Sequence, residues 1–148
     1  MINIYLIKYT DLQKAKDRIL SKYSQVSGNT YSIDYSPNGA PQLISGSLQK
    51  AYVSISHTDG LLAMAFSDDK VGIDVERADR EVSPKVCKSI EEWTRIEAYA
   101  KWTGKGLSKD ILHLPASPHH HSCNHATQKR NPPGYRCGIR AEGLSADS

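Results

Sequence analysis

The densest β-forming region of the chain, residues 52–76, most constrains how it folds. Three runs rich in apolar and β-branched residues lie at 52–57, 61–66 and 71–76. Only short turns separate them, at Asp59-Gly60 and at Asp68-Asp69. Short runs bounded by turn residues are typical of β-strands. The region therefore predicts three consecutive strands with very short connections.

The N-terminal third predicts a strand, a helix and a second strand. The side chains of residues 2–7 alternate in character, which indicates a strand with one strongly apolar face. Thr10 and Gln13 have the spacing of a helix capping box. A further strand at 31–35 ends in a turn at 36–39. Between the two strands, apolar residues recur at helical spacing: Leu12, Ala15, Ile19 and Tyr23.

A second helix is predicted in the C-terminal half. Ser83-Pro84 is a helix-start signal, since Pro is tolerated at the first helical position and Ser can cap free amides. The main helix is expected from about 91 to 103, ending at Gly104. Its apolar stripe, expected to face the sheet, consists of Trp93, Ile96 and Ala100.

Composition excludes several classes of protein. At 148 residues the chain fits one compact unit, and its net charge of +3 comes from scattered basic residues, which does not indicate a nucleic-acid platform. The first apolar run is too short for a signal peptide or a membrane span. An odd number of cysteines without a C-x-x-C motif favours a reducing compartment. We therefore expect a cytoplasmic protein.

Residues 115–133 are rich in Pro, His, Ser and Asn and predict a long loop. Within it, His119, His120, His121, Cys123 and His125 lack the paired spacing of structural zinc sites, so we do not expect zinc there. A closing strand is predicted at 135–141.

Two motifs bring acidic residues together. In V-G-I-D-V-E, at residues 71–76, Asp74 and Glu76 point the same way from an otherwise apolar strand. In W-T-R-I-E-A-Y-A-K, Glu97 and Lys101 lie one helical turn apart on one face. Taken alone, each pair is more often a set of solvated surface charges. Together, three carboxylates form a partial shell for Mg²⁺, which prefers oxygen ligands and substrate phosphates.

The motif S-I-S-H-T, at residues 54–58, supplies a third polar group. A histidine at such a position is usually a turn residue bonded to its own backbone. The functional alternative is that Ser56 and His57 hold a phosphate group through charge-assisted hydrogen bonds.

The order of these motifs, followed by T-G-K-G-L at residues 103–107, resembles the 4'-phosphopantetheinyl transferase superfamily of the Sfp type. The resemblance implies an α+β fold of two small related lobes, residues 1–66 and 67–148. Each lobe would be an antiparallel sheet packed with a helix, with the active site in the cleft between them. Because both lobes belong to one chain, the resemblance favours a monomer.

The resemblance also implies a reaction. The 4'-phosphopantetheine arm of coenzyme A would pass to a serine of an acyl or peptidyl carrier protein, releasing 3',5'-ADP. Asp74, Glu76 and Glu97 would ligate Mg²⁺ or Mn²⁺. Glu97 would also orient or deprotonate the serine, Lys101 would hold the pyrophosphate, and His57 the 3'-phosphate.

The chain departs from the family pattern at two cationic positions. Family members usually carry Lys where Ile96 and Ala40 stand here, and the connection at 77–92 is shorter than usual. Each missing charge-assisted contact costs roughly 1.5 to 3 kcal/mol. These departures keep open an alternative, a relative that binds coenzyme A or a carrier protein without turnover.

Overall fold

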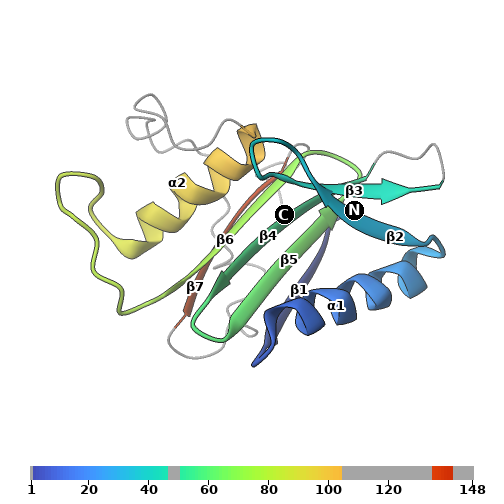
Figure 1. Ribbon diagram of the computed structural model, residues 1–148. Coiled ribbons are helices and arrows are strands. Elements are labelled where there is room, and N and C mark those ends of the chain that lie inside the picture. Colours follow the sequence, from blue (N-terminus) through green and yellow to red (C-terminus); the bar gives the residue numbers. More distant parts are fainter. Residues whose placement is uncertain (1, 47–50, 105–134, 142–148) are drawn as a thin grey trace.

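The computed structural model describes residues 2–46, 51–104 and 135–141 and has an α+β fold (Figure 1). The helices are α1 (Leu12–Ser27) and α2 (Ile90–Thr103). The first strands are β1 (Ile2–Lys8), β2 (Tyr31–Tyr35), β3 (Pro41–Ser45) and β4 (Tyr52–Thr58). The others are β5 (Leu61–Ser67), β6 (Val71–Arg77) and β7 (Tyr135–Ala141). None of the helices in these ranges is long and apolar enough to cross a membrane.

All backbone strand pairing in the described residues is antiparallel. The strands form a three-stranded sheet in the order β1-β5-β4, the hairpin β2-β3 and the pair β6-β7. The three consecutive strands predicted at 52–76 are confirmed, and so are the strands predicted at 2–7, 31–35 and 135–141. Strand β3 was not predicted from the sequence.

Strand β6 joins the larger sheet through side chains. The hydroxyl oxygen of Ser54 accepts from the Ile73 N–H at 3.0 Å, and that of Ser56 accepts from the Val75 N–H at 3.1 Å. Because the partner numbers rise together, β4 and β6 run parallel. Two buried serines thus satisfy backbone groups of β6 that face β4.

Strand β5 is buried on both faces and divides the core. Its side chains at 62, 64 and 66 form one core cluster with α1 residues Ala15, Ile19 and Tyr23, which the sequence predicted to recur at helical spacing. Its side chains at 61, 63 and 65 contact the apolar residues of β6. The opposite face of β6, which holds Gly72 and the side chains of Asp74 and Glu76, is therefore directed toward α2.

The residue that caps the first helix lies one position later than the sequence predicted. The residue that caps α1 is Asp11, whose carboxylate accepts from the Lys14 N–H at 3.0 Å, so the capping box at Thr10 and Gln13 was wrong. A carboxylate three residues before a free amide is well placed to cap it.

The second helix confirms the predicted end at Gly104, which has the left-handed φ of 72° common at helix C-termini. The start signal at Ser83-Pro84 was wrong. The Ser83 carbonyl accepts from Val86 and Cys87 in an isolated turn, and the helix starts after Ser89, whose hydroxyl accepts from the Glu92 N–H at 3.1 Å.

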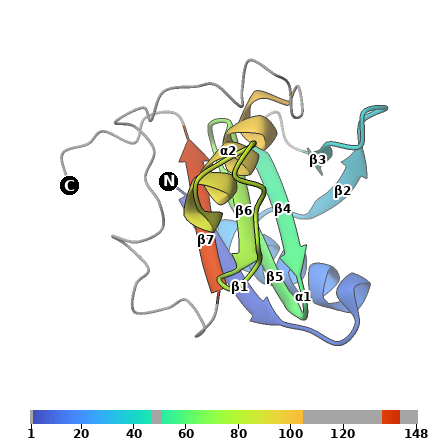
Figure 2. The ribbon, with the colours of Figure 1, turned by 90° about the vertical axis from the view of Figure 1, so that its left-hand side faces the viewer.

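Helix α2 lies directly on β6, as Figure 2 shows. A Cβ built at Gly72 would come 2.0 Å from the Ala98 carbonyl oxygen and 2.6 Å from the Trp102 backbone nitrogen. Of the expected stripe of Trp93, Ile96 and Ala100, Ala100 is buried and the other two residues are partly buried. The buried residues of α2 are Ile90, Thr94, Ala98 and Ala100. Ala98 lies opposite Gly72, where the helix and strand backbones approach closely.

Three predictions fall elsewhere in the chain. The loop at 115–133, the histidine-rich stretch at 119–125 and the motif beyond Gly104 lie outside the described residues. Cys87 is buried and free.

Candidate active site

An acidic cluster lies between β6 and α2. Asp74 and Glu76 come from the face of β6 that α2 covers, and they are only 4% and 9% exposed. Glu97 comes from the middle of α2 and is partly buried. The three carboxylates interact electrostatically, because Glu76 and Glu97 both raise the pKa of Asp74. The acids that the sequence analysis singled out therefore lie in one neighbourhood.

Asp74 is the centre of the cluster. Its Oδ1 accepts hydrogen bonds from the Ser56 hydroxyl and from Lys101 Nζ, each at 3.0 Å. Its Oδ2 is buried and accepts no hydrogen bond from any described residue. Burial raises the pKa of Asp74 to about 6, and the opposing effect of Lys101 does not cancel this shift. Asp74 is thus a buried carboxylate with one oxygen unsatisfied.

The other two acids differ in their partners. The Arg80 guanidinium donates to Glu76 Oε1. Burial raises the pKa of Glu97, Lys101 opposes this shift and Glu76 adds to it. A partly buried carboxylate with a raised pKa is a better proton acceptor than a solvated one.

The donor chemistry of the cluster fits a hard divalent cation. Three carboxylates in mutual repulsion and an unpaired Asp74 Oδ2 offer the oxygen ligands that Mg²⁺ takes. Within residues 2–46, 51–104 and 135–141, however, no three His, Cys, Asp or Glu side chains form a ready metal-binding group. Lys101 and Arg80 are the cations that the carboxylates contact instead.

The two residues of the S-I-S-H motif have different surroundings. The Ser56 hydroxyl is buried and bonded to Val75 and Asp74, so it positions the Asp74 carboxylate. His57 is exposed, and its Nδ1 lies 3.4 Å from the Tyr9 hydroxyl. Partial desolvation of the ring and the nearby charges of Lys16 and Lys101 lower the pKa of His57.

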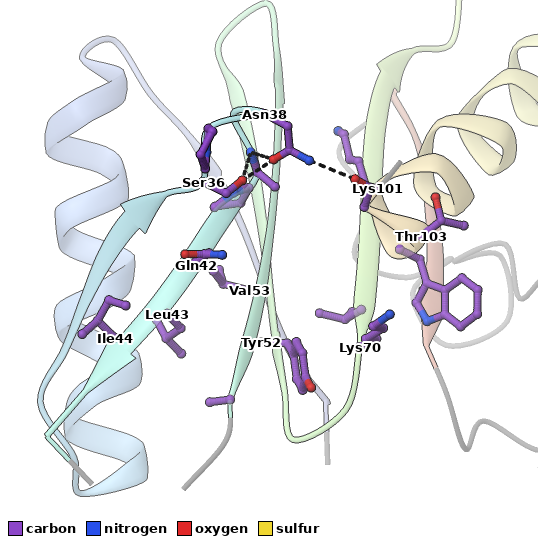
Figure 3. Close-up of a pocket in the computed structure, with 17 residues that line it drawn as sticks. Ser36, Asn38, Gln42, Leu43, Ile44, Tyr52, Val53, Lys70, Lys101 and Thr103 are labelled. Carbon is purple, nitrogen blue, oxygen red and sulfur yellow. Dashed lines mark hydrogen bonds between the residues drawn. The ribbon is translucent and has the colours of Figure 1, made fainter. Parts of the chain in front are cut away.

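Two cavities adjoin the cluster, and Lys101 lines both. The larger, about 710 Å³, lies between the β2-β3 hairpin, the start of β4 and the C-terminal end of α2 (Figure 3). The smaller, about 350 Å³, is lined by Glu97 and Lys101 and by residues of β4. The turn before β3 closes one side, because Asn38 Nδ2 donates to the Gly104 carbonyl at 3.1 Å. The Lys101 side chain therefore lines both cavities and also contacts the Asp74 carboxylate.

No protein-family model matches this chain, and no curated protein matches it.

Sequence reasoning missed two cations of this site, Arg80 and Lys16. Arg80 is four residues beyond Glu76, a separation that lets a turn after the strand bring them together. Lys16 is on α1, and its Nζ lies 3.4 Å from the Tyr35 hydroxyl. Nothing in the local pattern around Lys16 indicates its proximity to His57.

The role of Ser56 can be tested against that of Ser54. Either alanine variant leaves a buried backbone N–H of β6 without its acceptor, so each is expected to lose about 1 to 3 kcal/mol in the free energy of unfolding. Only Ser56→Ala also removes a donor to Asp74, so only this variant should raise the Asp74 pKa further. Denaturant unfolding and a carboxyl ¹³C NMR titration measure the two effects. An unchanged Asp74 titration in Ser56→Ala would refute the positioning role.

Proposed function

We propose that this protein transfers the 4'-phosphopantetheine arm of coenzyme A to a serine of an acyl or peptidyl carrier protein, with Mg²⁺ or Mn²⁺ as cofactor. The observation that carries the proposal is the buried Asp74 carboxylate, with one oxygen unsatisfied, flanked by Glu76 and Glu97 and contacted by Lys101. The motif order of the sequence supports the same reaction.

The acidic cluster is costly for the fold, which favours a functional role for it. Raising a carboxyl pKa from 3.8 to about 6 corresponds to a cost of folding on the order of 3 kcal/mol when the group is ionised. A purely structural site would be served by apolar residues of similar size. A bound divalent cation offsets the repulsion among the carboxylates.

The cavities beside the cluster suit a large anionic substrate. Lys101 has a flexible side chain that is 32% exposed, and it reaches from the cavities to Asp74. A pyrophosphate in the smaller cavity offers Lys101 a second anionic partner. A phosphate beside His57 and Lys16, at the C-terminal end of β4, would raise the His57 pKa that desolvation and the two lysines lower, and so would favour charge-assisted donation by His57.

The residues suggest a division of labour in the reaction. The serine hydroxyl attacks the phosphorus that bears the pantetheine arm, the pyrophosphate bond breaks, and 3',5'-ADP leaves. Glu97 accepts or orients the proton of the hydroxyl, and Lys101 stabilises charge on the phosphates. Asp74, Glu76 and Glu97 would hold a divalent cation, which would supply charge neutralisation on the pyrophosphate.

We also propose that residues 1–66 and 67–148 are two related lobes of a monomer, with the active site in the cleft between them. The protein is then cytoplasmic, where coenzyme A and carrier proteins occur together.

Ile96→Lys is expected to raise the transfer rate about tenfold, because it adds a cation beside Glu97 for a polyanionic substrate. Ile96 is partly buried on α2, which leaves room for the longer side chain to reach solvent. Ile96→Met serves as the uncharged control and should match the unmodified protein. A rate in Ile96→Lys no higher than in Ile96→Met would argue against a phosphate subsite at this position.

The function is tested by incubating the protein with coenzyme A, Mg²⁺ and a panel of apo carrier proteins, and measuring 3',5'-ADP. Release that depends on both carrier and metal is the expected result. Binding of coenzyme A without release on any carrier would favour the alternative, a non-catalytic binder, which Ala40 and Ile96 in place of two lysines support.

A further inference from the structure

Arg80 reaches into the acidic cluster from the protein surface. It lies in the turn that follows β6, where its N–H donates to the Arg77 carbonyl at 3.2 Å. Its guanidinium Nη1 donates to Glu76 Oε1. The Arg80 side chain is 49% exposed, whereas the Glu76 side chain is only 12% exposed. A half-solvated cation therefore neutralises an almost buried acid.

Arg80 also interacts with the rest of the cluster. The hydrogen bond to Glu76 raises the pKa of Arg80, and the charges of Glu76, Asp74 and Glu97 raise it further. Lys101 pairs with Asp74 in the same way, with Nζ 3.0 Å from Oδ1. The acids thus have two protein cations where the proposed function has a metal ion.

We propose that Arg80 is a built-in competitor of the divalent cation, which neutralises Glu76 in the metal-free protein and leaves it when the metal binds. The inference rests on the proposed function, because it requires a metal at Asp74, Glu76 and Glu97. A guanidinium and a metal ion compete for the same Glu76 oxygens. Release is inexpensive because half of the Arg80 side chain is already in solvent. Arg80 therefore lowers the metal affinity while preventing repulsion within the empty cluster.

Trp93 provides an internal reporter of this exchange. The Arg80 guanidinium carbon lies 6.0 Å from the centroid of the Trp93 ring, within the range of a cation–π contact. When the guanidinium leaves Glu76, the electrostatic surroundings of the indole change. Metal binding should therefore alter tryptophan fluorescence in the protein alone, without coenzyme A or a carrier.

The test is a titration of the full chain with MgCl₂, followed by calorimetry and by tryptophan fluorescence. Arg80→Ala is expected to bind Mg²⁺ about fivefold more tightly and to lose most of the fluorescence change. Arg77→Ala removes the same charge from the same turn, but Arg77 pairs with Asp59 and Asp79 instead of Glu76. Its Mg²⁺ affinity should stay within about twofold of the unmodified protein.

The outcomes separate this inference from the function on which it rests. Equal or weaker Mg²⁺ binding by Arg80→Ala, in a protein that still binds Mg²⁺ and transfers the arm, overturns the role of Arg80 alone. Absence of Mg²⁺ binding in every variant overturns the metal site and the inference with it. Arg80→Gln keeps most of the side-chain length and carries the same expectation if the alanine variant does not fold.

Discussion

Asp74→Asn is expected to reduce transfer by about a thousandfold, because it removes the central charge of the proposed cation site. Asparagine has the same shape and can still accept hydrogen bonds from Ser56 and Lys101. The loss should therefore reflect charge and not packing. Steady-state transfer rates measure the effect. Asp69→Asn, at an exposed aspartate, is the matched control and should leave the rate unchanged.

The same substitution should make the protein more stable at pH 7, by about 1 to 3 kcal/mol. The folded pKa of Asp74 is about 6 and its ordinary value is 3.8, so ionisation destabilises the folded state. This penalty is complete above pH 6 and disappears as the pH falls from 6 to 4, since the folded state then takes up the proton. The charged groups that interact with Asp74 are Lys101, Glu76, Glu97 and Arg80.

The difference in the free energy of unfolding between the unmodified protein and Asp74→Asn is measured by denaturant unfolding between pH 4 and pH 8, without added metal. The stability advantage of Asp74→Asn should shrink toward pH 4. An asparagine variant that is less stable at pH 7 and fully active would contradict the interpretation of Asp74 as a functional, strained carboxylate.

Gly72→Ala is expected to cost about 3 kcal/mol or more in the free energy of unfolding. The added Cβ would lie 2.0 Å from the Ala98 carbonyl oxygen, so helix α2 must shift. Because α2 carries Glu97 and Lys101, the shift should also abolish transfer. The lack of a side chain at Gly72 thus allows α2, with Glu97 and Lys101, to pack against β6, which carries Asp74 and Glu76.

The matched control for Gly72 is Gly46→Ala. Among the described residues, and apart from its chain neighbours, no atom lies within 4 Å of a Cβ built at Gly46, so the free energy of unfolding of Gly46→Ala should change by less than about 0.5 kcal/mol. Thermal and denaturant unfolding measure both variants. A Gly72→Ala protein as stable as Gly46→Ala would mean that α2 does not lie against β6 as described.

Much of the local structure follows from patterns in the sequence. Alternation and short turns predicted β4, β5 and β6, and helical spacing with a terminal glycine predicted α2. The buried face of α2 was not predictable in this way, since it depends on Gly72 admitting the backbone at Ala98. A helix buries a stripe of large apolar residues when its side chains separate it from the sheet, whereas here the two backbones approach closely at Gly72.

The candidate site also combines placements that the sequence predicts with contacts that it does not. Asp74 and Glu76 share a face because of strand geometry, and Glu97 and Lys101 share one because of helix geometry. The contacts that join them are long-range. Ser56 bonds to Asp74 across two strands, and Arg80 returns to Glu76 through a turn with no strong sequence signal. Tertiary placement, not local pattern, determines such contacts.

The most direct test of the proposed transfer is the intact mass of an apo carrier protein after incubation with this protein, coenzyme A and Mg²⁺. The account predicts a mass increase of one phosphopantetheine arm, absent from a carrier whose acceptor serine is replaced by alanine and absent with Asp74→Asn. An unchanged mass for every carrier, in a protein that binds coenzyme A and Mg²⁺, would contradict it.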